Sequence, residues 1–333
     1  MKKLLILVLL LFLTGCSDVP QKHQKEFYSY LDTYSSFIYY GNKEDFDTYS
    51  ALLEEKLSYY DKLFDIYNSY DSFNNLKTLN DNAGIKEIKL DIEALELLTA
   101  AKTGFDESNG KVNIAFGSVL KIWHSYREAG LNNPQNAALP SYEDLREADN
   151  STDINALVID LEKQTAFIND KNMQVDVGAV AKGYCCEQIA NELKQMGIEN
   201  CLINLGGNVV AIGTPPERSG WNIGITNPWP ENGSSEITTY NTGGEDISLV
   251  TSGNYQRYYT VDGKKYNHII DPETLFPADI YASVTIINPS SYTADLLSTA
   301  LFTLPLSDGK ALAEKTNSKV IWVLNDGTIE QNF

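Results

Sequence analysis

The chain has 333 residues, of which 43% are hydrophobic, and a formal net charge of −19 at pH 7. This length and apolar fraction can build one large core or two interlocked cores. So acidic a chain offers no basic face to nucleic acid, and we expect no nucleic-acid partner. A phosphate-bearing ligand would need a local site made by a helix N-terminus, a lysine or a metal ion.

Residues 1–15 have the features of a signal peptide. Lys2 and Lys3 precede an apolar run, Leu4 to Leu13, that is too short to span a bilayer as a permanent helix. The run ends in Leu13-Thr14-Gly15-Cys16, which resembles a bacterial lipobox. The resemblance implies cleavage before Cys16, attachment of lipid to Cys16, and a polar tether over residues 16–26. We therefore predict a lipoprotein anchored to the extracytoplasmic face of a bacterial membrane, on its periplasmic or extracellular side.

The remaining residues, 27–333, are predicted to form one α+β unit of mixed or antiparallel sheets with flanking helices. Alternating apolar and polar residues predict a first strand over 27–40, and helical spacing predicts helices over 45–68 and 91–102. A polar loop follows at 132–140, and two later helices are predicted near 180–196 and 293–303. Short strands dominate the second half, at residues 157–161, 165–168, 201–212, 221–225, 249–251, 255–261, 265–270, 282–287 and 319–324.

Turn residues and cysteines add detail. Asn169-Asp170 and Asp262-Gly263 each predict a tight hairpin turn between strands. Cys185, Cys186 and Cys201 have no spacing typical of zinc or redox sites, and we expect them to be small core residues. A disulfide from Cys201 to one of the adjacent pair stays open as an alternative.

The segment from Val175 to Tyr184 runs from a strand into a helix. Its small residues allow a ligand to approach closely, the new helix presents free N–H groups, and Lys182 adds positive charge in the first turn. The segment is neither a Walker loop nor G-x-G-x-x-G. It is nevertheless typical of an anion-binding site.

Three further segments are weak predictors when taken singly. Gly206-Gly207 interrupts a strand and indicates a bulge or a ligand-facing backbone. Thr251-Ser252-Gly253 is a polar turn beside a strand. His268, one of three histidines, lies near the end of a predicted strand, where a lone histidine is more often structural than catalytic.

Residues 293–303 place Asp295 and Thr299 four positions apart on one face of an otherwise apolar helix. A carboxylate and a hydroxyl are hard oxygen ligands of the kind that magnesium or calcium prefers. The alternative is that Asp295 complements the helix dipole and Thr299 bonds back to its own backbone. Both interpretations fit this segment alone.

In this order, these segments closely resemble the ApbE family of flavin transferases, over essentially the whole mature chain. Leu31-Asp32-Thr33 resembles the opening strand of the family, and residues 67–72 resemble its early tyrosine and serine segment. Residues 110–123 resemble its Gly-x-x-Asp, Gly-Pro-Leu and Leu-Trp block. The chain departs from the family pattern at Asn113 and Asn254, where acids are common, and over Thr274 to Pro277.

The resemblance implies an FAD:protein FMN transferase with an FAD cleft and a magnesium ion at the pyrophosphate. FMN would pass to a threonine hydroxyl of a partner protein, such as an FMN-binding domain of a membrane electron-transfer complex, and AMP would be released. The implied metal ligands are Ala179, through its carbonyl, Asp295, Ser298 and Thr299. The implied flavin-nucleotide contacts are Leu31, Tyr67, Lys111, Val112, Asn113, Asp176, Lys182 and His268, with Gly207 and Ser252 lining the cleft.

The chemistry of these residues suits that reaction. Phosphoryl transfer needs charge neutralisation and in-line positioning more than covalent help. A threonine hydroxyl needs a base, and His268 is the best suited side chain near neutral pH, with Asp176 able to orient or replace it. Two alternatives remain at this stage: a magnesium-dependent FAD pyrophosphatase that gives FMN and AMP, and a non-catalytic FAD-binding lipoprotein.

Overall fold

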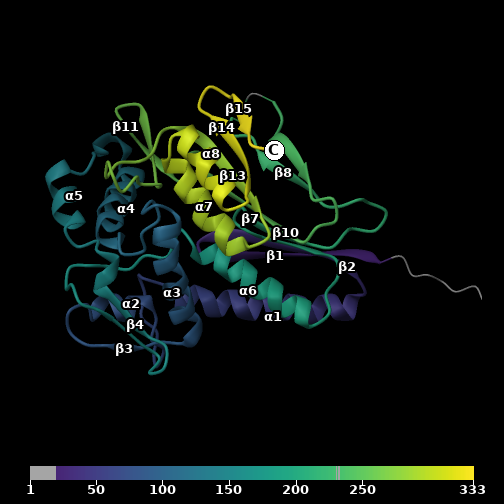
Figure 1. Cartoon of the computed structure of the whole chain (residues 1–333), viewed down its shortest axis with the longest axis horizontal. Coiled ribbons are helices and arrows are strands. Elements are labelled where there is room, and N and C mark those ends of the chain that lie inside the picture. Colours follow the sequence, from purple (N-terminus) through teal and green to yellow (C-terminus); the bar gives the residue numbers. More distant parts are fainter. Residues whose placement is uncertain (1–19, 230, 232) are drawn as a thin grey trace, which may run out of the picture.

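A computed structural model describes residues 20–229, 231 and 233–333 of the chain (Figure 1). The predicted signal peptide, Cys16 and the first residues of the predicted tether lie outside the described residues. None of the described helices is both long enough and apolar enough to cross a membrane.

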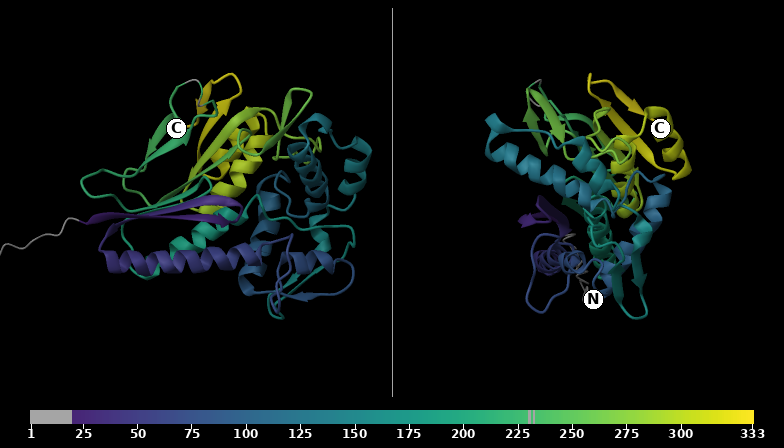
Figure 2. Two further views of the ribbon diagram at one scale, coloured as in Figure 1. Left: turned by 180° about the vertical axis from the view of Figure 1, so that it is seen from behind. Right: turned by 90° about the vertical axis from the view of Figure 1, so that its left-hand side faces the viewer.

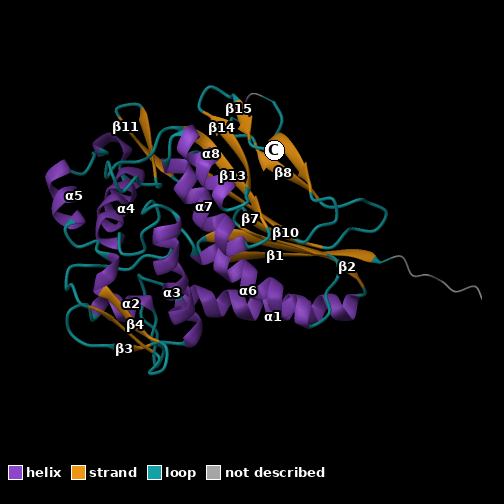
Figure 3. Cartoon of the chain, viewed as in Figure 1, coloured by secondary structure: helices purple, strands orange, loops and turns teal. Residues whose placement is uncertain are grey.

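An eight-stranded sheet, antiparallel throughout, forms the frame of the molecule (Figures 1 and 3). Strands β7 and β13 are buried along their whole length, because both faces of the sheet are covered at its centre. In spatial order its strands are β1 (Gln21–Tyr30), β2 (Thr33–Gly41), β6 (Cys201–Leu205), β7 (Asn208–Ile212), β10 (Ile247–Gly253), β13 (Tyr281–Asn288), β14 (Lys319–Leu324) and β15 (Ile329–Gln331).

Helices pack on one face of this sheet. The main core joins its strands to α1 (Lys43–Leu63), α6 (Ala181–Gln195) and α7 (Ser291–Thr303), and α8 (Leu306–Lys315) follows at the edge. The hairpin of β8 (Asn222–Thr226) and β9 (Glu236–Asn241) covers the opposite face through Trp221, Ile223 and Ile225. Figure 2 shows α1 and α6 lying together below the sheet.

A second group of elements lies beside the sheet. Its own apolar cluster joins α4 (Gly117–Asn132) and α5 (Tyr142–Asp149) to the hairpin of β11 (Tyr258–Val261) and β12 (Lys264–Asn267). The remaining elements are α2 (Leu76–Asp81), α3 (Ile92–Glu107), the small sheet β3 (Ile88–Lys89), β5 (Thr165–Ile168) and β4 (Leu157–Asp160), and the 3₁₀ turns η1 (Pro134–Asn136) and η2 (Ile154–Ala156).

Two expectations for the start of the chain are wrong. The segment predicted as one strand over 27–40 is a hairpin, because Leu31 and Asp32 adopt positive φ values of 52° and 51° and turn the chain back. Residues 21–26, expected to belong to the tether, form the first half of β1. Pairing with β2 and the stacking of His23 on Phe46, with ring centroids 5.1 Å apart, hold them there.

The other element predictions are mixed. The turn at Asp262-Gly263 is confirmed, whereas no strand follows Asn169-Asp170, because the turn that joins β4 to β5 lies at residues 161–164. The sequence did not predict α2, α4, α5 or α8, and the helix predicted over 45–68 ends at Leu63. Cys185, Cys186 and Cys201 are buried free thiols, as expected of small core residues.

Candidate active site

The contact between α6 and α7 places Asp295 at the start of α6. Asp295 is only 3% exposed, and its Oδ2 accepts a hydrogen bond of 2.7 Å from the backbone N–H of Gly183. A Cβ at position 183 would lie 2.4 Å from Asp295 Cβ, so only glycine allows the helices this close. The alternative that Asp295 complements the dipole of its own helix, α7, required contacts with the start of α7. Asp295 instead accepts a bond from the start of α6.

Burial raises the pKa of the Asp295 carboxyl, and the positive charge of Lys182 partly opposes that rise. A buried carboxylate of this kind gains stability when a cation binds beside it. The side chain of Asn208 is also buried and lies close enough to the carboxylate to lower the pKa of Asp295, as the N–H of Gly183 does, although its Nδ2 makes no hydrogen bond of good geometry among the described residues. These contacts offset only part of the cost of burial, since the pKa of Asp295 stays raised.

The side-chain hydroxyls of α7 differ in whether they form hydrogen bonds to the backbone of their own helix. Ser298 donates to Asp295 O at 2.9 Å, and its Oγ lies 2.8 Å from Ser252 Oγ on β10. Thr303 likewise donates to Ala300 O. Within the described residues, Thr299 makes no such bond to a carbonyl of its own helix, so the alternative of a back-bonded Thr299 is not what this fold adopts. Ser298 instead connects α7 to Ser252, another predicted site residue.

The donor set suits a hard cation. The described residues contain no group of three or more His, Cys, Asp or Glu side chains that could hold a metal ion. The available donors are the Asp295 carboxylate, the Thr299 hydroxyl and the carbonyl of Ala179, which lies in the turn just before α6. Oxygen donors that carry few charges are of the kind that hard cations such as magnesium prefer, whereas zinc sites are built mainly from cysteine and histidine.

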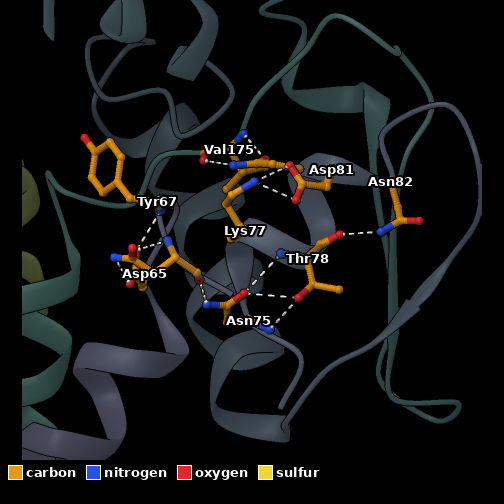
Figure 4. Close-up of polar contacts among 10 residues, drawn as sticks. Asp65, Tyr67, Asn75, Lys77, Thr78, Asp81, Asn82 and Val175 are labelled. Atoms are coloured by element: carbon orange, nitrogen blue, oxygen red, sulfur yellow. Dashed lines mark hydrogen bonds and ion pairs between the residues drawn. The ribbon is translucent and has the colours of Figure 1, made fainter. Parts of the chain in front are cut away.

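Hydrogen bonds with two polar side chains, Asp65 and Asn80, fix the backbone next to Tyr67 and Asp176. Asp65 Oδ1 accepts a hydrogen bond of 2.6 Å from the N–H of Tyr67 (Figure 4) and one of 3.0 Å from that of Asn68. The Asn80 side chain bonds to both the N–H and the carbonyl of Val175, at 2.7 and 2.9 Å, just before Asp176. Tyr67 is 54% exposed, so its ring is available to a ligand.

Asp176 begins the turn into α6. Its Oδ1 accepts a hydrogen bond of 2.8 Å from the N–H of Gly178, which fixes the turn that contains Ala179. Burial raises the pKa of the Asp176 carboxyl, while the bond from Gly178 and the nearby His124 oppose the rise. Asp176 is thus placed both to shape the Ala179 turn and to face His124.

His268 follows β12; part of its ring surface is open to water, while the rest is surrounded by protein. Its Nδ1 lies 3.2 Å from the carbonyl of Arg257, and Arg257 Nη2 donates to Asp32 O at 2.5 Å. Desolvation by the surrounding protein, followed by the positive charges of Arg257 and Lys182, lowers the pKa of His268 to about 4. His268 is therefore neutral at pH 7.

Three predicted contact residues, Lys111, Val112 and Asn113, direct their side chains into the protein. Lys111 is 8% exposed and pairs with Asp271 at 3.0 Å and Glu273 at 2.8 Å. Val112 lies in the core. Asn113 donates to Thr152 O and accepts from the N–H of Ala115. Any contact that this segment makes with a nucleotide would have to come from its backbone, and Lys111 instead supports the loop that follows His268.

Leu31 and Gly207 are turn residues. Leu31 has a positive φ, and its N–H donates to Asp61 Oδ1 at 2.7 Å. Gly207 has φ +94° and leaves its backbone open on a pocket of about 100 Å³, beside Thr251 and Tyr255. The N–H of Gly207 donates to Asn204 Oδ1 at 2.9 Å, so both turns are held by hydrogen bonds within the protein.

The departure at Asn254 has a structural explanation. Its Nδ2 donates to Tyr281 O at 3.1 Å and to Asn325 Oδ1 at 3.2 Å. A carboxylate could make neither bond, so the amide fits this chain where the family often has an acid.

The sequence did not single out three cationic or titratable residues of the site: His124, Arg127 and Arg257. His124 and Arg127 lie three positions apart on α4, and the His124 ring packs against Tyr67 in a tilted arrangement with centroids 5.2 Å apart. The available signal was the i, i+3 spacing of His124 and Arg127, which has meaning only on a helix, and α4 was not predicted.

A model of the ApbE family matches residues 31–323 of the chain. An FAD:protein FMN transferase of Treponema pallidum (strain Nichols) is 34% identical over 251 residues, covering 71% of this chain and 67% of the relative. An FAD:protein FMN transferase of Klebsiella pneumoniae (strain 342) is 30% identical over 253 residues, covering 75% of each. The crystal structure of the ApbE protein of Thermotoga maritima aligns with a TM-score of 0.79 and 27% identity, covering 94% of this chain and 97% of that one. The predicted α+β fold of this type is confirmed.

Proposed function

The chain belongs to the ApbE family, and on this premise we propose that it transfers FMN from FAD to a threonine hydroxyl of a partner flavoprotein. In this reaction the threonine oxygen bonds to the phosphorus of the FMN half, and the bond from that phosphorus to the bridging oxygen breaks. AMP leaves with the bridging oxygen, and the hydroxyl proton passes to a base. The observation that carries the proposal is that the charge of Lys182, at the start of α6, acts on both the buried carboxylate of Asp295 and the imidazole of His268, in a family of flavin transferases.

The hydrogen bond of His268 determines which of its nitrogens acts as the base. A carbonyl only accepts hydrogen bonds, so the contact with Arg257 O assigns the proton to Nδ1 and leaves Nε2 unprotonated. Nε2 then receives the proton of the threonine hydroxyl. A pKa of about 4 makes a weak base, but the negative charge of bound FAD raises the pKa of a nearby histidine toward neutrality. Binding of FAD would thus make His268 a stronger base.

Asp295, Thr299 and the carbonyl of Ala179 hold a magnesium ion in this proposal. The ion, when bound, neutralises the pyrophosphate charge and orients the in-line displacement. The protein itself contributes the Lys182 charge and the N-terminal turn of α6, which favour the same anionic group. Asp176 keeps the Ala179 turn in place through its bond to Gly178.

The setting of the reaction is also part of the proposal. Cleavage before Cys16 and lipidation of that residue would anchor the enzyme to the outer face of a bacterial membrane. Its acceptors would then be extracytoplasmic FMN-binding domains of membrane electron-transfer proteins. The tether would consist of residues 16–20, because β1 begins at Gln21.

Mass spectrometry of an FMN-binding acceptor domain incubated with the purified chain, FAD and magnesium tests the proposal. A mass gain of one FMN on threonine is expected, and it should disappear with EDTA and in Asp295→Ala. Asp308→Ala is the matched control, since Asp308 is an exposed carboxylate on the next helix, α8. Release of FMN and AMP with no modified acceptor would favour a pyrophosphatase, and intact FAD with every acceptor tried would contradict both enzymatic readings.

A further inference from the structure

On the far side of the candidate site, α4 presents two side chains that have no role in the transfer as argued so far. Trp123 is buried and donates its Nε1–H to Leu275 O at 2.9 Å, which fixes the rotation of α4. His124 and Arg127 then lie on the same side of α4 as Tyr67. Figure 1 shows α4 beside the β11 hairpin, which leads to His268.

The polar contact between these two residues is defined. Arg127 Nη2 lies 3.1 Å from His124 Nδ1, and because a guanidinium only donates, His124 accepts and carries its own proton on Nε2. The His124 ring in turn contacts the Tyr67 ring, tilted by 32° with centroids 5.2 Å apart. The guanidinium is therefore oriented by a side chain that itself packs against an aromatic ring.

The Arg127 guanidinium has N–H groups that remain available to a ligand. Its carboxylate contact within the described residues is Glu128 at 3.4 Å, a half-exposed side chain that gives a weak pair. Arg127 itself is 20% exposed, so water or a ligand reaches it. Its charge also acts on both Tyr67 and His268, which places all three around one region.

We propose that Arg127, oriented by His124, binds the pyrophosphate of FAD and makes the site selective for flavins that carry it. This inference rests on the proposed function. Arg127, Lys182 and Arg257 concentrate positive charge around His268 in a chain of net charge −19. Asp32, Asp65 and Asp176 also act on Tyr67 and offset part of this charge, so direct contact of a phosphate with the guanidinium matters more than the net field. A guanidinium suits the task because it offers paired N–H groups to phosphate oxygens. Arg127 is thus a specificity residue and His124 a positioning residue.

Binding measurements separate this role from a structural one. The affinities of the purified chain for FAD, for ADP and for riboflavin, which lacks phosphate, are measured by calorimetry or flavin fluorescence. Arg127→Gln is expected to weaken FAD and ADP by about tenfold or more, as the loss of one charged hydrogen bond implies, and to leave riboflavin unchanged. Arg127→Lys should recover part of the loss, and His124→Phe, which keeps the ring contact, should give a smaller loss than Arg127→Gln.

Arg146→Gln on α5 is the matched control, because Arg146 is exposed and belongs to the neighbouring helix. Equal FAD and ADP affinities in Arg127→Gln and Arg146→Gln would overturn the inference. So would equal losses for riboflavin and FAD in Arg127→Gln. If that variant fails to fold, Arg127→Met decides by the same comparison of FAD, ADP and riboflavin, since it keeps an apolar stem and removes the charge. Failure of the wild-type chain to modify any acceptor while it binds FAD would count against the proposed function alone.

Discussion

The contact between α6 and α7 can be tested with a single methyl group. Gly183→Ala would place a Cβ 2.4 Å from Asp295 Cβ and 2.5 Å from Ser291 O. Carbon atoms pack at about 3.5–4.0 Å, so the two helices would have to separate by roughly 1 Å. Such a shift also strains the hydrogen bond of 2.7 Å between Gly183 and Asp295.

The cost follows from these two effects. Overpacking costs about 1–3 kcal/mol, and loss of a hydrogen bond to a charged group costs about 1.5–3 kcal/mol. We expect the free energy of unfolding to fall by about 3 kcal/mol or more, and the Tm by roughly 5 °C or more. Because Asp295 moves with α7, transfer activity should fall by about a hundredfold even at temperatures where the variant is folded.

Gly309→Ala is the matched control in α8. The new Cβ would lie 3.6 Å from the Trp322 ring, which is ordinary van der Waals contact. Alanine is the better helix former, so this variant should gain about 0.5–1 kcal/mol. Thermal unfolding and acceptor labelling of both variants check the reasoning. A Gly183→Ala chain as stable and active as Gly309→Ala would refute the close-approach argument.

Three further predictions concern charge and hydrogen bonding. Asp295→Asn should abolish metal-dependent transfer yet raise the Tm of the metal-free chain at pH 7, because the raised pKa means that ionisation of the buried carboxyl disfavours the fold. The gain in Tm should shrink as the pH falls and the wild-type carboxyl becomes protonated. A Tm at pH 7 below that of the wild type would contradict this. His268→Gln should slow transfer by about a hundredfold or more, and unchanged rates would exclude His268 as the base. It should also flatten the fall of Tm between pH 6.5 and 4. The reason is that the pKa of His268 is about 4 in the folded chain, so the wild type has stability above pH 6.5 that it loses as the pH drops. Asn254→Asp should lower the free energy of unfolding by about 1–2 kcal/mol at pH 7, because a carboxylate would face the Tyr281 carbonyl, and denaturation at pH 7 and pH 4 would show whether protonation relieves the cost.

The sequence predicted the elements that follow strong local rules. Asp262-Gly263 gives the hairpin turn of β11 and β12 because both residues accept positive φ, and the apolar spacing of α1, α6 and α7 is regular enough to predict each helix. The helix α4 lacks a side-chain N-cap bond, and β1 has a polar, mostly exposed face. Their formation depends on tertiary contacts, such as those of Trp123 with Leu275 and of His23 with Phe46, which no local pattern reveals.

For the site, the sequence identified the residue types and their order along the chain. Asp295 and Thr299 on one helical face, Lys182 at a helix start and a lone His268 follow from spacing, and the family follows from their succession. Only the tertiary structure decided what each side chain does. It placed the Lys111 side chain in ion pairs with Asp271 and Glu273, and it brought Arg127 beside His124 and Tyr67 from a helix that the sequence did not predict. The physical reason is that the hydrogen bonds of a helix or a tight turn join neighbours in sequence. The partner of a charged side chain depends instead on which distant segments the core brings together.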